Sequence, residues 1–167
     1  MIKNALILIG VLIPAGLYSQ IPAGGNISIS VCATIVSESP VELTTLSNIT
    51  LDGEINDNRE IYVSPLTSPN AGLMMAKGKP GSQARIIYLL SEILTDNSGK
   101  GFIKINYEMS SNSDKIQKAS TLIEKGEATL NFNNQGICYL WVGGKINTSR
   151  AKPGKYTGQF TIEMEYL

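Results

Sequence analysis

The two cysteines are the residues whose types most directly suggest a chemical role. Cys32 and Cys138 are the two cysteines of the 167-residue chain. In an oxidising compartment they could form a disulfide that closes a long loop. Cys138 is also in phase with Leu140 and Val142 along a predicted strand, which would make it a small buried apolar side chain instead. The sequence leaves both interpretations open.

The remaining reactive side chains do not form a catalytic set. The chain has no histidine, which removes imidazole bases and histidine-ligated metals. Glu163 and Glu165 share one face of a predicted strand, but they alternate with apolar residues, as on a strand with one wet face. Ser82 lacks the second glycine of a nucleophile elbow, and the acidic stretch 52–60 lacks the ordered spacing of a calcium loop. We therefore expect no enzyme, no catalytic residues, no cofactor and no metal.

The amino terminus has the order of a secretory signal peptide. Lys3 precedes an apolar run over residues 5–13, and Pro14 follows it. Such a run is too short to span a bilayer. We predict a signal peptide over residues 1–19 and one mature domain over residues 20–167. The protein is then secreted, periplasmic or at the cell surface, with no transmembrane span after cleavage.

The charge balance argues against one class of partner. Fourteen Lys and Arg residues balance fourteen Asp and Glu residues, so the formal net charge is zero. A phosphate backbone attracts proteins with a basic surplus. We expect no nucleic-acid partner.

The mature chain has the pattern of short strands separated by turns. Apolar residues alternate with polar ones over 27–35, 102–107 and 156–167, and period two predicts strands. Residues 73–77 and 84–90 read as a strand pair around the turn 79–82, and Gly143-Gly144 reads as a break after a strand over 137–142. Segment 113–126 is either one short helix or a loop with a strand. The series predicts an all-β, antiparallel, immunoglobulin-like sandwich of about seven to nine strands.

Two aromatic residues are candidates for a binding surface. Tyr139 and Trp141 lie on the same side of a predicted strand. They could pack in the core or between the sheets, or form an exposed strip for a sugar or a partner.

The C-terminal third carries a recurring set of glycine, proline and tyrosine positions, namely Val142, Gly143, Gly144, Pro153, Gly154, Tyr156, Gly158 and Tyr166. The upstream turn 78–81 has the form Gly-x-Pro-Gly. These motifs resemble those of a bacterial secreted family called domain of unknown function 4402. The resemblance implies an exported protein with structural roles for these residues, and it implies no established biochemical activity.

The same ending is similar to spore coat protein U and to the chaperone-usher pilins, with Gly154 and Tyr166 at the matching positions. In such pilins an incomplete sandwich is filled by an alternating strand from a neighbour. Residues 27–35 have the period that a donor needs, and they could equally be the domain's own first strand. We expect an exported, non-enzymatic envelope or surface protein, structural or adhesive. The alternatives are a glycan- or peptide-binding module and a pilus-type subunit that joins like subunits or other envelope proteins by strand addition.

Overall fold

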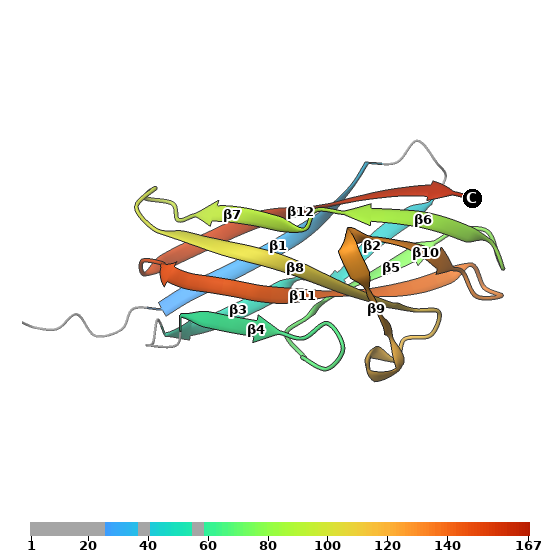
Figure 1. Ribbon diagram of the computed structural model, residues 1–167, viewed down its shortest axis with the longest axis horizontal. Helices are drawn as coiled ribbons and strands as arrows, with labels where there is room; N and C mark the ends of the chain where they lie inside the picture. Colours follow the sequence, from blue (N-terminus) through green and yellow to red (C-terminus); the bar gives the residue numbers. More distant parts are fainter. Residues whose placement is uncertain (1–25, 37–40, 55–58) are drawn as a thin grey trace, which may run out of the picture.

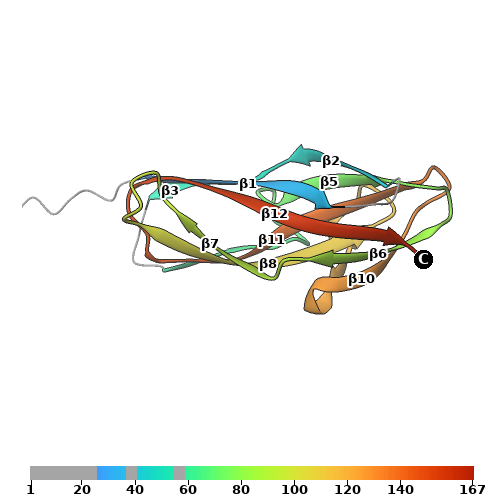
Figure 2. The ribbon, with the colours of Figure 1, turned by 90° about the horizontal axis from the view of Figure 1, so that it is seen from above.

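The structure, a computed structural model, describes residues 26–36, 41–54 and 59–167, which fold into two β-sheets (Figure 1). Sheet A has five strands. In spatial order they are β10 (Glu127–Asn131), β6 (Gln83–Tyr88), β12 (Gly154–Tyr166), β1 (Asn26–Val36) and β3 (Ile49–Glu54). The body is elongated along the strand direction, and β1 and β12 run beside each other along it (Figure 2).

Sheet B has seven strands. Its main order is β2 (Glu42–Ser47), β5 (Gly72–Lys77), β11 (Ile137–Arg150), β8 (Phe102–Asn112) and β7 (Ser91–Thr95). Off this path, β4 (Glu60–Val63) pairs with β11, and β9 (Thr121–Ile123) pairs with β8. The all-β prediction is confirmed.

The prediction of seven to nine antiparallel strands is wrong in two details. The described residues contain twelve strands, partly because one extended segment is split into β2 and β3 where it passes from sheet B to sheet A. Every strand pairing in the described part of the chain is antiparallel except that of β1 with β12, which run parallel.

The core lies between the inner faces of the two sheets. On β12 the side chains of Tyr156, Phe160 and Ile162 are at most 1% exposed, while Thr157, Gln159 and Thr161 on the other face are exposed or lie at intermediate depth. The Tyr107 ring of β8 packs on Phe160 with centroids 4.5 Å apart. The alternation of apolar and polar residues in the sequence thus corresponds to one buried and one outward face per strand, as expected when two sheets pack face to face.

The predicted pairing of residues 73–77 with 84–90 is wrong. The two strands form as β5 and β6, but β5 belongs to sheet B and β6 to sheet A. Met74 and Ile86 are both buried, at 2% and 0% exposure, because the two strands cover the core from opposite layers. The turn between them therefore crosses the sandwich instead of closing a hairpin.

Segment 113–126 follows the loop-and-strand alternative. Short 3₁₀ turns at Gln117–Ala119 and Glu124–Gly126 flank β9, and the described part of this segment contains no α-helix. A helix would have placed Ile116 and Ile123 on one apolar face. In the structure Ile116 is 55% exposed and Ile123 is 5% exposed.

A buried tyrosine fixes the turn that leads into β12. The Tyr156 hydroxyl accepts a hydrogen bond from the Lys152 backbone nitrogen at 2.8 Å and donates one to the Lys152 carbonyl oxygen at 2.9 Å. The Tyr156 side chain is fully buried. The hydroxyl thus satisfies both backbone groups of one turn residue.

We expect Tyr156→Phe to lower the free energy of unfolding by about 1 to 3 kcal/mol, because two partly buried backbone groups lose their partner, the buried Tyr156 hydroxyl. Urea unfolding followed by circular dichroism measures this. Tyr62→Phe is the matched control, since Tyr62 is 54% exposed and donates to Glu108 at the surface. An equal loss in both variants would contradict the role assigned to Tyr156.

Candidate functional site

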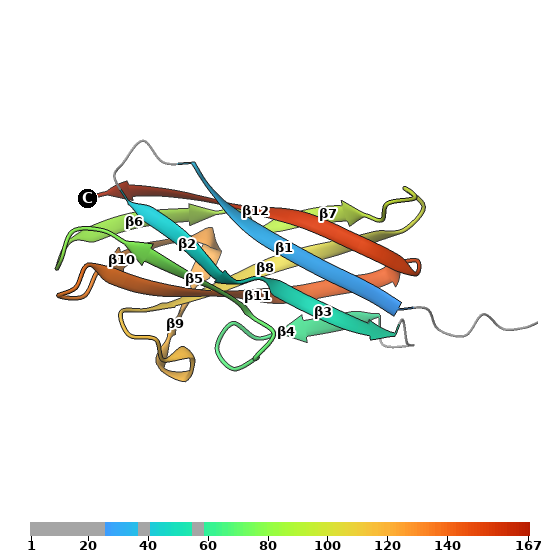
Figure 3. The ribbon, with the colours of Figure 1, turned by 180° about the vertical axis from the view of Figure 1, so that it is seen from behind.

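The most distinctive site in the fold is the position of β1 between β12 and β3, which Figure 3 shows from behind. Its parallel register with β12 runs over ten residue pairs, from Ile27 opposite Gly154 to Val36 opposite Glu163. Its antiparallel register with β3 runs from Asn26 opposite Glu54 to Val31 opposite Ile49. The first strand of the described chain thus lies between the last strand and β3.

The inner face of β1 completes the core. Ile27, Ile29 and Val31 are 3%, 0% and 4% exposed. Burying an aliphatic side chain of this size contributes about 1.5 to 3 kcal/mol, so these three contribute about 5 to 9 kcal/mol as an upper estimate. That is comparable with the whole stability of an ordinary domain, about 5 to 15 kcal/mol. The sandwich needs a strand at this position.

Removing β1 would leave a strand-shaped gap. β12 keeps its other neighbour β6, but β3 pairs with no strand other than β1 among the described residues. The edges of β12 and β3 that face each other would then present unpaired backbone N–H and C=O groups. The apolar core residues that β1 covers would be exposed between them. Such an edge can bind another extended chain, with main-chain hydrogen bonds for affinity and alternate side chains for specificity.

Two glycines of the family-like motif lie in the middle of a strand. β11 continues through Gly143 and Gly144 to Arg150, so the predicted break after residue 142 is wrong. A Cβ on Gly143 would overlap the Val63 carbonyl oxygen of β4, and one on Gly144 would overlap the Asn106 carbonyl oxygen of β8. These glycines let β11 approach both neighbouring strands closely.

The other motif residues lie along and before β12. Pro153 is exposed just before the strand, and Val142 is buried in β11. At Gly158, a Cβ would lie 2.7 Å from the Leu94 side chain. The Tyr166 hydroxyl accepts a hydrogen bond from the Lys79 backbone nitrogen at 2.8 Å. All these contacts are structural, because they hold strands and turns of the two sheets against one another.

Cys138 is a free, buried thiol in the structure. Its sulfur donates to the Asn112 carbonyl oxygen at 3.6 Å and borders a hollow of about 360 Å³ whose lining has no charged side chain. Burial raises the pKa of the Cys138 thiol to about 12. Cys32 lies opposite Gln159 in the β1–β12 register, and its side chain is outside the described residues. Of the two interpretations for Cys138, the structure has the unbridged buried thiol.

This burial predicts a loss of stability at high pH. The unfolded thiol ionises near its ordinary pKa of 9.0, while the folded thiol keeps its proton up to about 12. Between these values the unfolded state binds fewer protons, so the free energy of unfolding falls as pH rises, by about 1 kcal/mol per pH unit.

The measurement is urea unfolding between pH 8 and 10, and both chains compared carry the same tyrosines, so that tyrosine ionisation near pH 10 affects them equally. It compares a Cys32→Ser chain with the same chain carrying Cys138→Ala. The chain that keeps Cys138 should lose stability more steeply above pH 9. Parallel curves would show that the folded thiol ionises as easily as the unfolded one.

Tyr139 and Trp141 lie on the outer side of sheet B. Their rings are 6.3 Å apart, and Trp141 is outside the core cluster although it is only 4% exposed. Pro65 accepts hydrogen bonds from Ser110, which pairs with Trp141, and from Gln117, so loops 64–71 and 113–120 lie over this part of the sheet. Neither alternative describes Trp141 fully. The ligand role of the pair stays a prediction.

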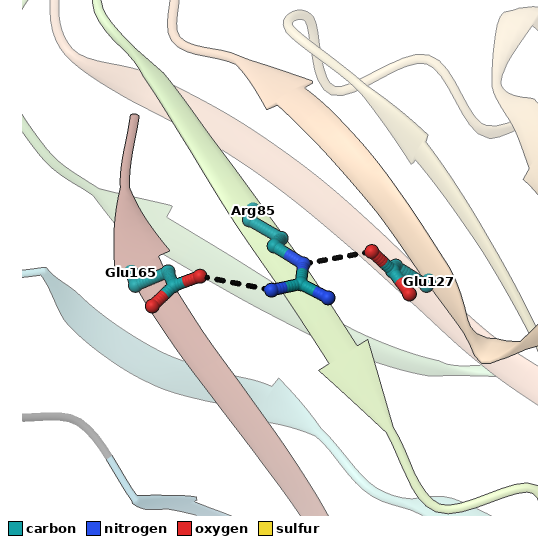
Figure 4. A network of polar contacts seen from close by, with 3 residues as sticks. All are labelled: Arg85, Glu127 and Glu165. Carbon is teal, nitrogen blue, oxygen red and sulfur yellow. Dashed lines mark hydrogen bonds and ion pairs between the residues drawn. The ribbon is translucent and has the colours of Figure 1, made fainter.

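Glu163 and Glu165 face outward on β12, as predicted for a wet face. Glu165 accepts a hydrogen bond from Arg85 at 3.2 Å, and Arg85 also donates to Glu127 at 2.7 Å (Figure 4). Arg85 thereby joins β6 to both of its neighbours, β10 and β12. This contact gives Glu165 a cross-strand role that requires no chemistry.

The sequence analysis did not identify β3 and β12 as the two strands that pair with residues 27–35. The regular alternation of that segment was the available signal.

The predicted signal peptide lies outside the described residues. Residues 26–36, 41–54 and 59–167 contain no helix long and apolar enough to cross a membrane. In that same part of the chain no three His, Cys, Asp or Glu side chains are grouped to hold a metal ion.

Comparison with models of known protein families and with curated proteins finds no match to this chain.

Proposed function

We propose that this protein is an exported, non-enzymatic structural subunit of the cell envelope or cell surface, and that copies of it join by exchanging β1. The membership in the secreted family that its C-terminal motifs resemble is part of the same proposal. A neighbour's β1 would replace the chain's own strand between β12 and β3.

The observation that supports this proposal best is the placement of β1. It is terminal among the described strands, it is held by pairing on both edges, and it supplies three core side chains. An element that is exchanged between identical chains makes the same contacts in either chain, so the exchange costs little free energy once the strand has left its place. The segment itself alternates Ile or Val with polar residues, as strand addition requires.

A non-enzymatic role agrees with the chemistry of the described side chains. The Cys138 thiol is buried and its pKa is raised, which makes it a poor nucleophile, and the outward Glu165 is paired with Arg85. We place the protein outside the cytoplasm on the strength of the predicted signal peptide at residues 1–19.

The test is the size of the purified chain of residues 20–167 in detergent, before and after heating. We expect oligomers that resist detergent at room temperature and separate on boiling. Ile29→Asp should abolish them, because it puts a charge on the fully buried face of β1. Ser30→Asp is the matched control on the other face of the same strand, and its oligomers should remain.

Circular dichroism separates the outcomes. A folded wild-type chain that is monomeric at all concentrations would contradict the proposal. Oligomers of equal stability in both variants would also contradict it, because assembly would then use another surface.

A further inference from the structure

A second surface feature lies on the outer face of sheet B, far from the β1 position in the strand order. It is a hollow of about 480 Å³ between β7, β8 and β11, at the end where β7 leads into β8 in Figure 1. Its apolar wall includes Ile93 and Phe102, which are 67% and 39% exposed. We name it the β7–β8–β11 hollow.

The apolar side chains are neighbours across two strands. Ile93 lies opposite Lys104 in the β7–β8 register, and Phe102 is two residues before Lys104 on the same face. Exposed single apolar residues are ordinary, but an exposed aromatic ring and an exposed isoleucine that line the same hollow are not. The volume is within the range of sites that bind one small molecule, about 300 to 1,000 Å³.

The polar groups of the hollow are dominated by hydrogen-bond donors. Lys104 and Arg150 line it, and neither has an ion-pair partner within the described part of the chain. Asn147 lies between them, and its side-chain oxygen already accepts two hydrogen bonds from Ser149, at 3.0 and 2.6 Å. The Asn147 amide nitrogen is left as a donor.

One carboxylate lies in the same cross-strand row as Asn147, and it forms no ion pair with either cation of the hollow. Glu60 lies opposite Asn147 in the β4–β11 register, with Arg59 directly before it in the chain. Within the described part of the chain neither Lys104 nor Arg150 forms an ion pair with a carboxylate, and the apolar wall is exposed to solvent.

We infer that the β7–β8–β11 hollow binds a small amphipathic organic anion, a carboxylate or sulfonate that carries an aromatic ring or a short acyl chain. The anionic group lies near Lys104, Asn147 and Arg150, and the apolar body packs on Ile93 and Phe102. Charge complementarity selects the anion, and a volume of about 480 Å³ matches one small molecule. This inference stands independently of strand exchange.

Fluorescence titration with anilinonaphthalene sulfonate tests it, because this probe combines an aromatic body with one anionic group. We expect saturable binding of one probe per chain, displaced by decanoate. Lys104→Gln combined with Arg150→Gln should weaken binding at least about tenfold, and so should Phe102→Ser. The neutral phenylnaphthylamine, which lacks the sulfonate, should be insensitive to the charge substitutions.

Two control variants keep the test specific. Lys155→Gln removes an exposed cation of sheet A, and Leu90→Ser removes an apolar side chain that is 53% exposed outside the hollow. Both should bind the probe as the wild type does, and all variants should keep the wild-type circular-dichroism spectrum.

Several results would overturn the inference. These are the absence of stoichiometric probe binding, equal affinity in the hollow variants and the controls, and attachment to vesicles of anionic phospholipid without binding of monomeric decanoate. The last result would identify a membrane-docking surface.

Discussion

A chain that begins at Val41 should not reach the native fold alone, and should reach it when a peptide of residues 26–36 is added. Without β1 the core loses Ile27, Ile29 and Val31, whose burial contributes about 5 to 9 kcal/mol. β12 and β3 also lose their shared neighbour. The peptide restores both the apolar face and the hydrogen-bonded edges.

The measurement is the near-ultraviolet circular-dichroism signal of the shortened chain as peptide is titrated in. The same peptide carrying Ile29→Asp is the matched control and should have no effect. If the shortened chain were native without peptide, β1 would be dispensable to the sandwich. A rescue by both peptides would show that side chains on the inner face do not select the strand.

The second large effect is expected at Gly144. Gly144→Ala should lower the free energy of unfolding by more than about 3 kcal/mol, because the added Cβ overlaps the Asn106 carbonyl oxygen of the neighbouring strand and the φ of +139° is unfavourable for an L residue. β11 is the central strand of sheet B, so neither neighbour can move away without cost to the core. Guanidinium unfolding, or failure to accumulate folded protein, measures this.

Gly81→Ala provides the control for backbone strain alone. Gly81 has a φ of +68°, and no atom lies within 4 Å of an added Cβ. The expected loss is about 1 to 2 kcal/mol, the cost of a left-handed residue. Comparable losses at Gly144 and Gly81 would mean that close strand approach at Gly144 contributes nothing.

Local pattern in the sequence predicts the strands well, because each strand covers the core with one face. The alternation over residues 27–35 and 102–107 corresponds to β1 and β8. Glu163 and Glu165 are exposed to solvent, as the alternation along their strand predicts. The same pattern cannot say which layer a strand joins. β5 and β6 have similar patterns and adjacent positions, yet they belong to opposite sheets.

The site itself depends on pairings that local pattern does not contain. The contact of β1 with β12 joins residues more than a hundred positions apart, and its parallel direction follows from the path of the whole chain. Gly143-Gly144 illustrates the same limit, since two glycines suggest a break until the neighbouring strands β4 and β8 are known. Trp141 lies on the outer side of its strand and is nevertheless only 4% exposed, and its cross-strand partner Ser110 is hydrogen-bonded to Pro65 of a loop distant in sequence.

The central claim, that one chain's β1 occupies another chain's position between β12 and β3, is tested most directly by a mixed disulfide. Ser30 lies opposite Thr157 in the β1–β12 register, and both are on the outer side of sheet A. One chain carries Ser30→Cys and an isotopically heavy chain carries Thr157→Cys, both in a Cys32→Ser background. After the two are unfolded, refolded together and oxidised, we predict a heavy–light disulfide between these positions in the mass spectrum. Its absence, while a single chain carrying both substitutions forms the bond internally, would show that β1 stays in its own sandwich and would contradict the account.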